Sequence, residues 1–250
     1  MLTEERHGLI LSLVNQRNAV TVLELSKELD ISESTIRRDL TSLDKIGKLN
    51  KVRGGATSIM GEFSSIERDM GTKEYLNIEE KHAIGEYAAS LIYSDDVVYI
   101  DAGTSTLQLV AHLSNPRTIF ITNGLQHAGV LSQNGCRVYV TGGMVRQTTG
   151  AMVGVEAVHA IRKYNFTKAF MGVNGITAAQ GLTTPDPEEA QVKIAAVQQA
   201  YLSYALADHT KFRKVYSTSF AELEKVCIIT DYLSDLALAK KTVIKEVAKE

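Results

Sequence analysis

The chain has 250 residues, of which 44% are hydrophobic and 22% charged, and its formal net charge is −2. This composition is typical of a globular protein with a real core, and it excludes a strongly basic chromatin-like protein and an acidic disordered tail. The length fits one large domain or two unequal ones.

The sequence shows no sign of a membrane span, of export or of a structural metal. The longest run without Asp, Glu, Lys or Arg has 19 residues, Thr118–Cys136, and its amide and histidine side chains do not suit a bilayer. Residues 1–6 hold three charges and no apolar signal core. The two cysteines, Cys136 and Cys227, are too few for a disulfide framework and lie in no metal-ligand spacing. We therefore expect a cytoplasmic protein.

The N-terminal segment carries three successive helical patterns. Over residues 3–16 the apolar side chains at helical spacing are Leu9, Ile10, Leu13 and Val14. Thr21 and Glu24 have the spacing of a capping box, which predicts a second helix with Val22, Leu25 and Leu29 on its apolar side. Ser32 is the expected N-cap of a third helix, whose apolar stripe comprises Ile36, Leu40, Leu43 and Ile46.

Basic and hydroxyl side chains occupy the arc of the third helix opposite this stripe, namely Ser34, Arg37, Arg38, Thr41 and Lys45. From Lys45 to Met60 there are four basic residues and no acidic one, although residues 1–60 hold nine basic and eight acidic residues. Leu49 and Val52, followed by a glycine pair, suit a short β-hairpin wing. Two helices joined by a tight turn, with Arg, Ser and Thr outside, form the arrangement that enters a major groove. The alternative is a small three-helix surface domain with solvated charges.

The segment Ser32-Glu-Ser-Thr-Ile-Arg-Arg-Asp-Leu40, with Lys51-Val-Arg-Gly-Gly-Ala56, resembles the winged helix-turn-helix of the DeoR family of bacterial sugar-metabolism repressors. The resemblance implies double-stranded operator DNA as a partner. It implies as DNA-facing residues Ser34, Thr35, Arg37, Arg38, Thr41, Lys51, Arg53, Gly54 and Gly55. Arginine suits this role because its planar fork binds guanine or a phosphate bidentately, although the sequence does not assign which arginine reads a base. Asp39 is expected to orient an arginine or to cap locally rather than to touch DNA.

Residues 58–80 mix charges with few large apolar residues, which indicates a linker with helical stretches. It separates a DNA-binding domain of residues 1–57 from a second domain of residues 81–250. In that second domain, compact apolar runs predict strands at 97–101, 118–122, 137–141, 168–173, 202–207 and 226–230. Helical patterns lie between them, near 81–93, 105–114, 124–133, 154–164 and 187–200. The alternation predicts a mainly parallel sheet covered on both faces, with ligands at the carboxyl ends of its strands.

Glycines and short polar residues follow four of these strands: Asp101–Thr106, Thr122–Gly124, Thr141–Gly143 and Gly172–Gly175. Glycine permits tight turns and helix N-terminal amides attract anions, so these loops favour a small polyhydroxy or phosphorylated ligand. The alternative is that they only turn and cap. Lys211, after a fifth strand, suits a phosphate or is a surface lysine. Glu189 and Lys193 have the i,i+4 spacing of an ordinary stabilising pair on a helix that begins near Pro187.

This half is similar to the DeoR-family sensor domain, which shares the fold of ribose-5-phosphate isomerase. The resemblance implies the fold class α/β, a winged helix-turn-helix followed by a Rossmann-like parallel-sheet domain that binds a sugar phosphate and needs no further cofactor. It implies as effector-binding residues Asp101, Gly103, Thr104, Ser105, Thr106, Thr122, Asn123, Gly142, Gly143, Asn174, Glu189, Lys193, Asp208 and Lys211. Residues 181–190 most resemble members that control fructose uptake and respond to fructose 1-phosphate, although other hexose phosphates carry the same phosphate group.

The strongest alternative is an active sugar-phosphate isomerase joined to a DNA-binding domain. Isomerisation needs a positioned base, and the isomerases carry acidic residues after the strand that here continues into Met171–Thr177, where no carboxylate occurs, although Glu189 remains. A Rossmann dehydrogenase is disfavoured because no Gly-x-Gly-x-x-Gly follows the first strand. The six histidines show no metal spacing, and only His209 adjoins the expected pocket. We therefore expect no catalytic residues and a homo-oligomeric repressor, a dimer or tetramer, of a sugar operon that is relieved by a phosphorylated sugar.

Overall fold

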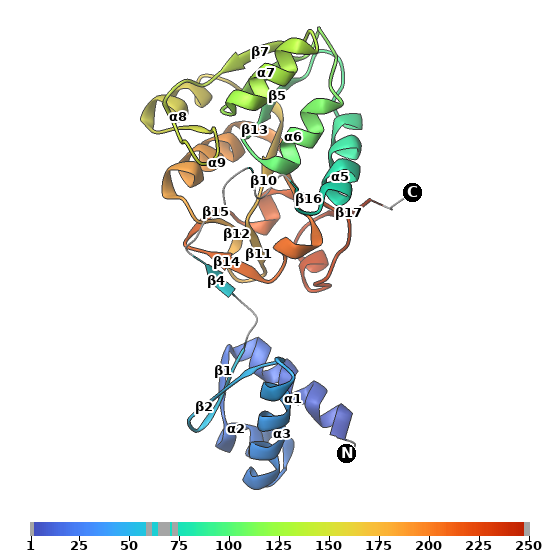
Figure 1. The fold of residues 1–250 in the computed structure, drawn as a ribbon, viewed down its shortest axis with the longest axis vertical. Coiled ribbons are helices and arrows are strands. Elements are labelled where there is room, and N and C mark those ends of the chain that lie inside the picture. The colour runs from blue at the N-terminus through green and yellow to red at the C-terminus, as the bar shows by residue number, and fades with distance from the viewer. Residues whose placement is uncertain (1–2, 59–61, 65–70, 72–74, 248–250) are drawn as a thin grey trace. The chain divides into compact units, whose positions relative to one another are not determined.

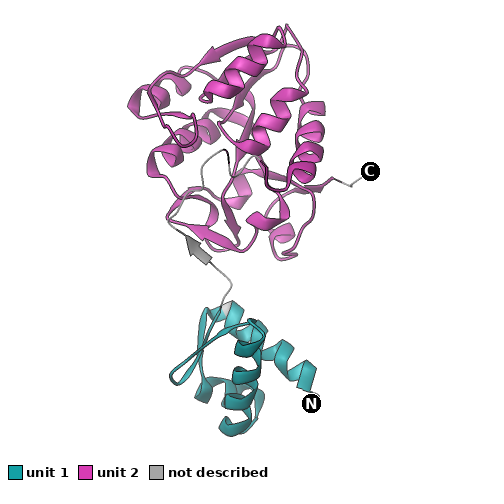
Figure 2. Cartoon of the chain, viewed as in Figure 1, with its two compact units in different colours: residues 1–62 teal, residues 63–250 magenta. Residues whose placement is uncertain are grey.

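The computed structural model of the protein describes residues 3–58, 62–64, 71 and 75–247. It divides into two compact units, residues 1–62 and residues 63–250, and each has a hydrophobic core of its own (Figures 1 and 2). Parts of the expected linker, residues 59–61, 65–70 and 72–74, lie outside the described residues.

The smaller unit contains three helices and a three-stranded antiparallel sheet. The helices are α1 (Thr3–Arg17), α2 (Val22–Leu29) and α3 (Glu33–Lys45). The strands are β1 (Ala19–Thr21), β2 (Asn50–Val52) and β3 (Gly55–Thr57), in the order β1-β3-β2. The expected hairpin after α3 is therefore confirmed as β2 and β3, whereas the sequence patterns did not predict β1.

Local capping fixes where α2 and α3 begin. The predicted capping box is confirmed, because Glu24 N donates to Thr21 Oγ1 at 3.1 Å and Thr21 N donates to Glu24 Oε2 at 2.7 Å. The chain then turns at Asp30, which has a left-handed φ of 54°. Ser32 accepts a hydrogen bond from Thr35 N at 3.4 Å and caps α3 as expected.

Most of the predicted apolar stripes pack into the core of the smaller unit, with two exceptions. Ile46 is 64% exposed because α3 ends at Lys45 and the chain leaves the helical stripe at this C-cap position. Leu9 is 41% exposed, since Ile10 and Val14 form the face of α1 that is turned toward the core. The expectation that Leu9 and Ile46 are core residues was therefore wrong.

The larger unit is built on a seven-stranded sheet in which every neighbouring pair is parallel. Its strands are β5 (Val97–Ile100), β6 (Ile119–Thr122), β7 (Arg137–Val140), β10 (Phe166–Gly172), β13 (Ala200–Leu206), β16 (Cys227–Thr230) and β17 (Ile244–Glu246). Their order is β17-β16-β13-β10-β5-β6-β7. The chain proceeds from β5 outward to β7 and then returns to the other side of β5 with β10. The sheet therefore has a topological switch point between β5 and β10.

Helices cover both faces of this sheet (Figure 1). On one face lie α5 (Ile78–Ser90), α6 (Thr104–Ala111) and α7 (Leu125–Gln133), whose buried residues pack with Val98 and Ile100. On the other face lie α8 (Val155–Ile161) and α9 (Pro187–Gln199), which share a core cluster with Tyr99. Alternate residues of β5 thus point to opposite faces, as expected for a strand buried on both sides.

Short elements complete the unit. Two strand pairs are β4 (Glu62–Ser64) with β14 (Lys214–Tyr216) and β8 (Met144–Val145) with β9 (Met152–Val153). A further three-stranded sheet contains β11 (Gly175–Thr177), β12 (Gly181–Thr184) and β15 (Thr218–Ala221). The 3-10 helices span His209–Lys211, Leu223–Lys225 and Leu238–Lys240. Within the described ranges, no helix has both the length and the apolar character needed to cross a bilayer.

Candidate functional site

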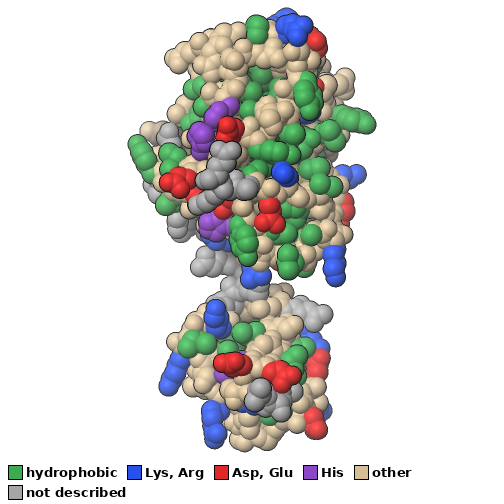
Figure 3. All heavy atoms as spheres, turned by 90° about the vertical axis from the view of Figure 1, so that its right-hand side faces the viewer, with side chains coloured by type: hydrophobic (Ala, Val, Ile, Leu, Met, Phe, Trp, Pro, Cys, Tyr) green, Lys and Arg blue, Asp and Glu red, His purple; other side chains and the backbone are tan. Residues whose placement is uncertain are grey.

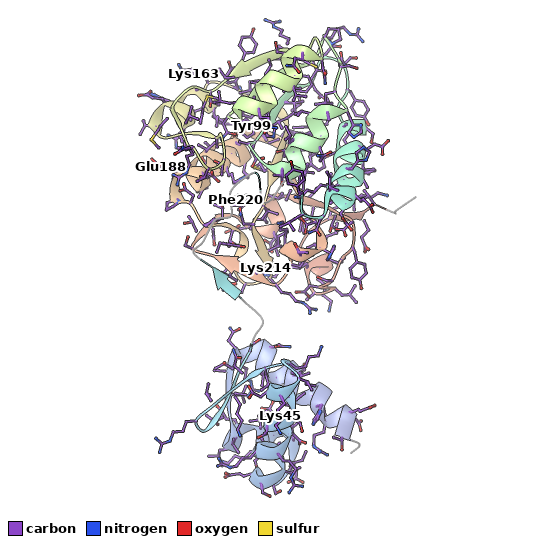
Figure 4. All side chains as sticks on the ribbon, viewed as in Figure 1. Lys45, Tyr99, Lys163, Glu188, Lys214 and Phe220 are labelled. Carbon is purple, nitrogen blue, oxygen red and sulfur yellow. The ribbon has the colours of Figure 1, made fainter. Side chains whose placement is uncertain are left out.

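The smaller unit presents polar and basic side chains along α3. Ser34, Arg37 and Arg38 are exposed, while Thr35 and Thr41 are partly buried. Arg37 Nη2 donates to Glu33 Oε2 at 3.0 Å, an exposed pair one helical turn apart. Lys45 ends the helix on the same unit (Figure 4), and basic side chains project from the surface of this unit in Figure 3. The hydrogen-bond donors of Ser34, Arg37 and Arg38 are therefore accessible at the surface.

The hairpin is fastened to α3 at its first strand. Lys51 N donates to Asp44 Oδ1 at 2.8 Å, and Lys51 Nζ donates to Thr41 Oγ1, also at 2.8 Å. Arg53 and Gly54 are exposed at the turn, and Gly54 has a φ of 90° that a residue with a side chain adopts only under strain. A hydrogen bond between two of the predicted residues, Thr41 and Lys51, thus holds α3 and the hairpin together.

The buried carboxylate of Asp39, in α3, links this helix to α1. The carboxylate accepts hydrogen bonds from Arg6 Nε at 2.6 Å and Arg6 Nη2 at 2.9 Å, and His7 Nε2 lies 3.2 Å from Oδ1. Burial raises the pKa of Asp39, but the bonds from Arg6 and His7 outweigh burial and hold the pKa below its ordinary value. The expectation that Asp39 orients an arginine is confirmed, and that arginine, Arg6, lies in α1 rather than on the exposed arc of α3.

In the larger unit, a small cavity of about 50 Å³ lies at the switch point, where the loops after β5 and β10 meet. Seven of the residues predicted to bind an effector line it: Gly103, Thr104, Ser105, Asn174, Glu189, Lys193 and Lys211. Ala102, Gly172, Val173 and Thr149 complete the lining. A Cβ on Gly103 would lie 3.1 Å from Thr106 Oγ1 and 3.3 Å from Asp101 Oδ1, so the loop after β5 folds tightly on its own side chains at this glycine.

Asp101 and Lys193 form a buried ion pair at the base of this pocket. Lys193 Nζ donates to Asp101 Oδ2 and, at 2.9 Å, to the carbonyl oxygen of Gly172, while Asp101 Oδ1 accepts from Gly172 N at 3.0 Å. Lys193 Nζ also lies 5.4 Å from the ring centroid of Phe220 (labelled in Figure 4). The spacing of Glu189 and Lys193 predicts a pair on a helix surface, but both side chains are buried and Lys193 bonds across to the strand-end loops.

Thr106 and Asn123 support the loop after β5 from behind. Thr106 Oγ1 accepts from Gly103 N at 2.9 Å and lies 3.0 Å from His127 Nε2. Asn123 Oδ1 accepts from Ala102 N at 3.1 Å and from the hydroxyl of Tyr99 at 3.0 Å. Burial lowers the pKa of His127 to about 4, so its imidazole is neutral at physiological pH. These side chains position the start of α6 and lie behind the cavity.

Glu189 faces the cavity from the first turn of α9 and is held by a residue that sequence reasoning missed. Asp186 caps this helix, accepting from Glu189 N at 2.9 Å, with Pro187 at the first helical position as expected. Thr149 Oγ1 donates to Glu189 Oε1 at 2.9 Å. Thr149 lies between β8 and β9, whose two-residue strands are too short to leave a recognisable sequence pattern.

The remaining predicted residues do not line the pocket. Thr122 is buried at the end of β6, and Gly142 and Gly143 follow β7 with φ values of 72° and 107°. Asp208 is fully buried after β13, and Lys211 Nζ lies 3.6 Å from its Oδ2. No group of three His, Cys, Asp or Glu side chains among the described residues is arranged to hold a metal ion.

Comparisons with known proteins cover both units. Residues 6–61 match the DeoR-like helix-turn-helix domain, and residues 76–232 match the DeoR C terminal sensor domain. The uncharacterized HTH-type transcriptional regulator FruR of Bacillus subtilis is 39% identical, and the alignment covers 99% of each chain. The lactose phosphotransferase system repressor of Streptococcus mutans is 34% identical, again over 99% of each chain.

Among solved structures, ribose 5-phosphate isomerase A of Methanocaldococcus jannaschii matches 54% of this chain and 55% of its own, with 15% identity and a TM-score of 0.41. The two domain matches and the full-length relatives decide the assignment. They show that the chain belongs to the DeoR family of HTH-type transcriptional regulators.

Proposed function

We propose that this regulator represses a sugar uptake or catabolic operon in the cytoplasm, and that a phosphorylated sugar in the pocket of the larger unit releases it from operator DNA. The observation that carries the proposal is the pocket at the switch point between β5 and β10. Open parallel sheets bind their ligands there, at the carboxyl ends of the strands. The exposed polar face of α3 and its wing supply the DNA-binding half of the proposal.

The pocket has the polarity that a sugar phosphate requires. Thr104 and Ser105 begin α6, so the amides of its first turn and the ammonium of Lys211 suit the phosphate. Glu189, which already accepts a hydrogen bond from Thr149, would repel an anion and suits the hydroxyl groups. The polarity of the lining matches a ligand with a phosphate at one end and hydroxyls at the other, and fructose 1-phosphate is the first such compound to test.

On the DNA side, the proposed contacts are made by Ser34, Thr35, Arg37, Arg38 and Thr41 of α3 in the major groove. Lys51, Arg53 and Gly54 of the wing would lie along the phosphates. Gly55, which the resemblance also implies as DNA-facing, is buried in β3 against Val20 and supports the wing instead. A winged helix-turn-helix unit of this size makes few base contacts. We therefore propose a homo-oligomer that places two or more such units on repeated half-sites. The ligand acts by binding the DNA-incompetent arrangement more tightly than the competent one.

A thermal-shift screen of sugar phosphates, each against its unphosphorylated sugar, tests this proposal. A ligand at a hundred times its Kd should stabilise the native state by about 2.7 kcal/mol, and the phosphorylated form alone should do so. The stabilising compound should also release the protein from its own promoter DNA in a mobility-shift assay. Stabilisation by the free sugar, or turnover of the sugar phosphate by the protein, would contradict the proposal.

A further inference from the structure

One buried carboxylate connects the pocket to the start of α5. Asp208 is fully buried, and its Oδ1 accepts hydrogen bonds from Thr210 N at 3.0 Å and from Asn77 Nδ2 at 3.1 Å. Its Oδ2 is also buried and has no hydrogen-bond partner among the described residues. The ammonium of Lys211, which lines the pocket, lies 3.6 Å from that oxygen, outside hydrogen-bond distance.

Asn77 is placed unusually for the residue that precedes a helix. It occupies the N-cap position of α5 with a left-handed φ of 52°, and its side chain makes no capping bond. The amide instead reaches Asp208, 131 residues further along the chain. Asparagine adopts the left-handed conformation more readily than most residues, so the position serves the contact with Asp208 rather than the stability of α5.

Asp208 is ionised and depends on its neighbours for compensation. Burial raises its pKa, but the charges of Lys211 and Lys81 and the hydrogen bonds from Thr210 outweigh burial and keep the pKa below its ordinary value. Lys81 is itself buried in the first turn of α5. Of the two cations that act on Asp208, Lys211 lines the pocket, whereas Lys81, like Asn77, lies at the start of α5.

We infer that Asp208 is the relay through which an anionic ligand in the pocket acts on the first turn of α5, with Asn77 as the residue that transmits the change. The inference rests on the proposed function. A phosphate draws Lys211 toward itself and away from Asp208. Because a buried charge that loses a partner is costly, the carboxylate turns to the partners that remain, Asn77 and Lys81. Within the described residues, α5 is the first long helix after the boundary between the two units, so its first turn is the part of the pocket region nearest in sequence to the DNA-binding unit.

The test is the variant Asn77→Gly in the full-length chain. Glycine accepts the left-handed φ without strain and removes only the amide. The matched control is Asn115→Ala. It removes the side-chain hydrogen bond that Asn115 Nδ2 donates to Ser94 Oγ at 3.1 Å, between the loops that precede β6 and β5. The probes are fructose 1-phosphate, fructose 6-phosphate, glucose 6-phosphate and inorganic phosphate. Calorimetric titration measures ligand binding, and a mobility-shift assay on the protein's own promoter measures DNA affinity.

The wild-type chain and Asn115→Ala should lose about 5- to 150-fold in DNA affinity when the active probe is bound, the usual range of allosteric coupling. Asn77→Gly should bind the probe within about threefold of wild type but lose less than about threefold in DNA affinity. Release by Asn77→Gly equal to wild type would overturn the relay, and so would loss of its ligand binding. If no probe releases DNA from the wild-type chain, the proposed function fails first, and the relay fails with it.

A second measurement does not depend on the variant folding. In the wild-type chain, amide hydrogen exchange in the first turn of α5 should change at least about threefold on binding the active probe, since local opening responds to altered side-chain contacts. Exchange in the first turn of α9, which also adjoins the pocket, reports ligand occupancy. A change in α9 without any change in α5 would overturn the relay.

Discussion

Asp39 and Asp101 are both buried carboxylates whose partners come from distant parts of the chain. Asp39 joins α3 to α1 through Arg6, and Asp101 joins β5 to α9 through Lys193, 92 residues away. Local patterns suggested that Asp39 orients an arginine, and the family resemblance marked Asp101 and Lys193 as site residues. Neither the local pattern nor the resemblance could identify Arg6 as the partner of Asp39 or pair Lys193 with Asp101. Contacts between residues so far apart in the sequence are decided by the tertiary fold. At the scale of the residue, sequence suggests which residues gather near one another better than it predicts their contacts.

Arg37→Ala should weaken operator binding while leaving thermal stability nearly unchanged. The side chain is more than half exposed and pairs only with Glu33 among the described residues, and such exposed pairs contribute about 0.3–0.5 kcal/mol. A lost base or phosphate contact costs about 1–3 kcal/mol, which lowers affinity about 5- to 150-fold. Mobility shifts and thermal melts measure the two effects. Arg17→Ala, which breaks an exposed pair with Glu28 elsewhere on the unit, is the control. Unchanged affinity would remove Arg37 from the interface.

Thr104→Ala, at the start of α6, should abolish release by the ligand and preserve DNA binding, since Thr104 lines the pocket of the larger unit. Lys211→Ala should also abolish release by the ligand, because its ammonium lines the same pocket. This variant removes the cation beside Asp208 as the ligand would, so the relay predicts weaker DNA binding by Lys211→Ala even without ligand. The control is Lys163→Ala, an exposed lysine after α8 (Figure 4). DNA release titrations with the stabilising sugar phosphate provide the measurement. If release survives in both variants, the proposed phosphate site is misplaced.

His127 should make the larger unit less stable as the pH falls below neutrality. Its pKa is lowered to about 4 in the folded chain, whereas the unfolded chain binds a proton near pH 6.5. Between these values only the unfolded state is protonated, so stability decreases as the pH falls from about 6.5 to 4. From pH 7 to pH 5, wild type should lose about 2 kcal/mol more than His127→Gln in chemical denaturation. Equal losses in the two proteins would contradict a neutral buried His127.

At the scale of secondary-structure elements, the sequence predicted what is local. All six expected strands of the main sheet and all five expected helices of the larger unit are present, because buried parallel strands and amphipathic helices leave distinct patterns. The edge strand β17 has only three residues, two of which are Lys245 and Glu246, so it left no apolar run that could predict it. The order of the strands, and hence the switch point, depends on contacts between segments far apart in the sequence. Pattern alone does not contain that order, although the family resemblance implies the fold.

Gly55→Ala should disrupt the small sheet that supports the wing. A Cβ at this position would lie 2.2 Å from the carbonyl oxygen of Val20, so β1 and β3 would be forced apart. The variant should melt at lower temperature in the smaller unit and bind DNA less tightly, but it should bind sugar phosphate normally. Gly8→Ala is the control, because nothing lies near its Cβ in α1 and alanine favours a helix by about 0.5–1 kcal/mol. Normal DNA binding by Gly55→Ala would show that this sheet does not position the wing.

At the scale of the whole molecule, two units with separate cores divide the work between recognition and sensing. A single winged head recognises only a short sequence, so the proposed oligomer supplies affinity as well as symmetry. We expect the chain to sediment as a dimer or tetramer. It should bind a duplex with two half-sites about 10²- to 10⁴-fold more tightly than a duplex with one. Sedimentation and DNA titration measure these quantities. A monomer, or equal affinity for the two duplexes, would contradict the oligomer.

The ion pairs around the pocket give the two units different responses to ionic strength. Around the pocket, the carboxylates of Asp101, Glu189 and Asp208 are accompanied by Lys81, Lys193 and Lys211, and all of these except Lys211 are buried, where salt screens charges less than at the surface. The proposed DNA contacts are exposed, and each phosphate contact lowers affinity as salt rises, with a slope of about −0.9 on a logarithmic scale. Salt should therefore weaken operator binding more than it weakens the binding of sugar phosphate to the DNA-free protein.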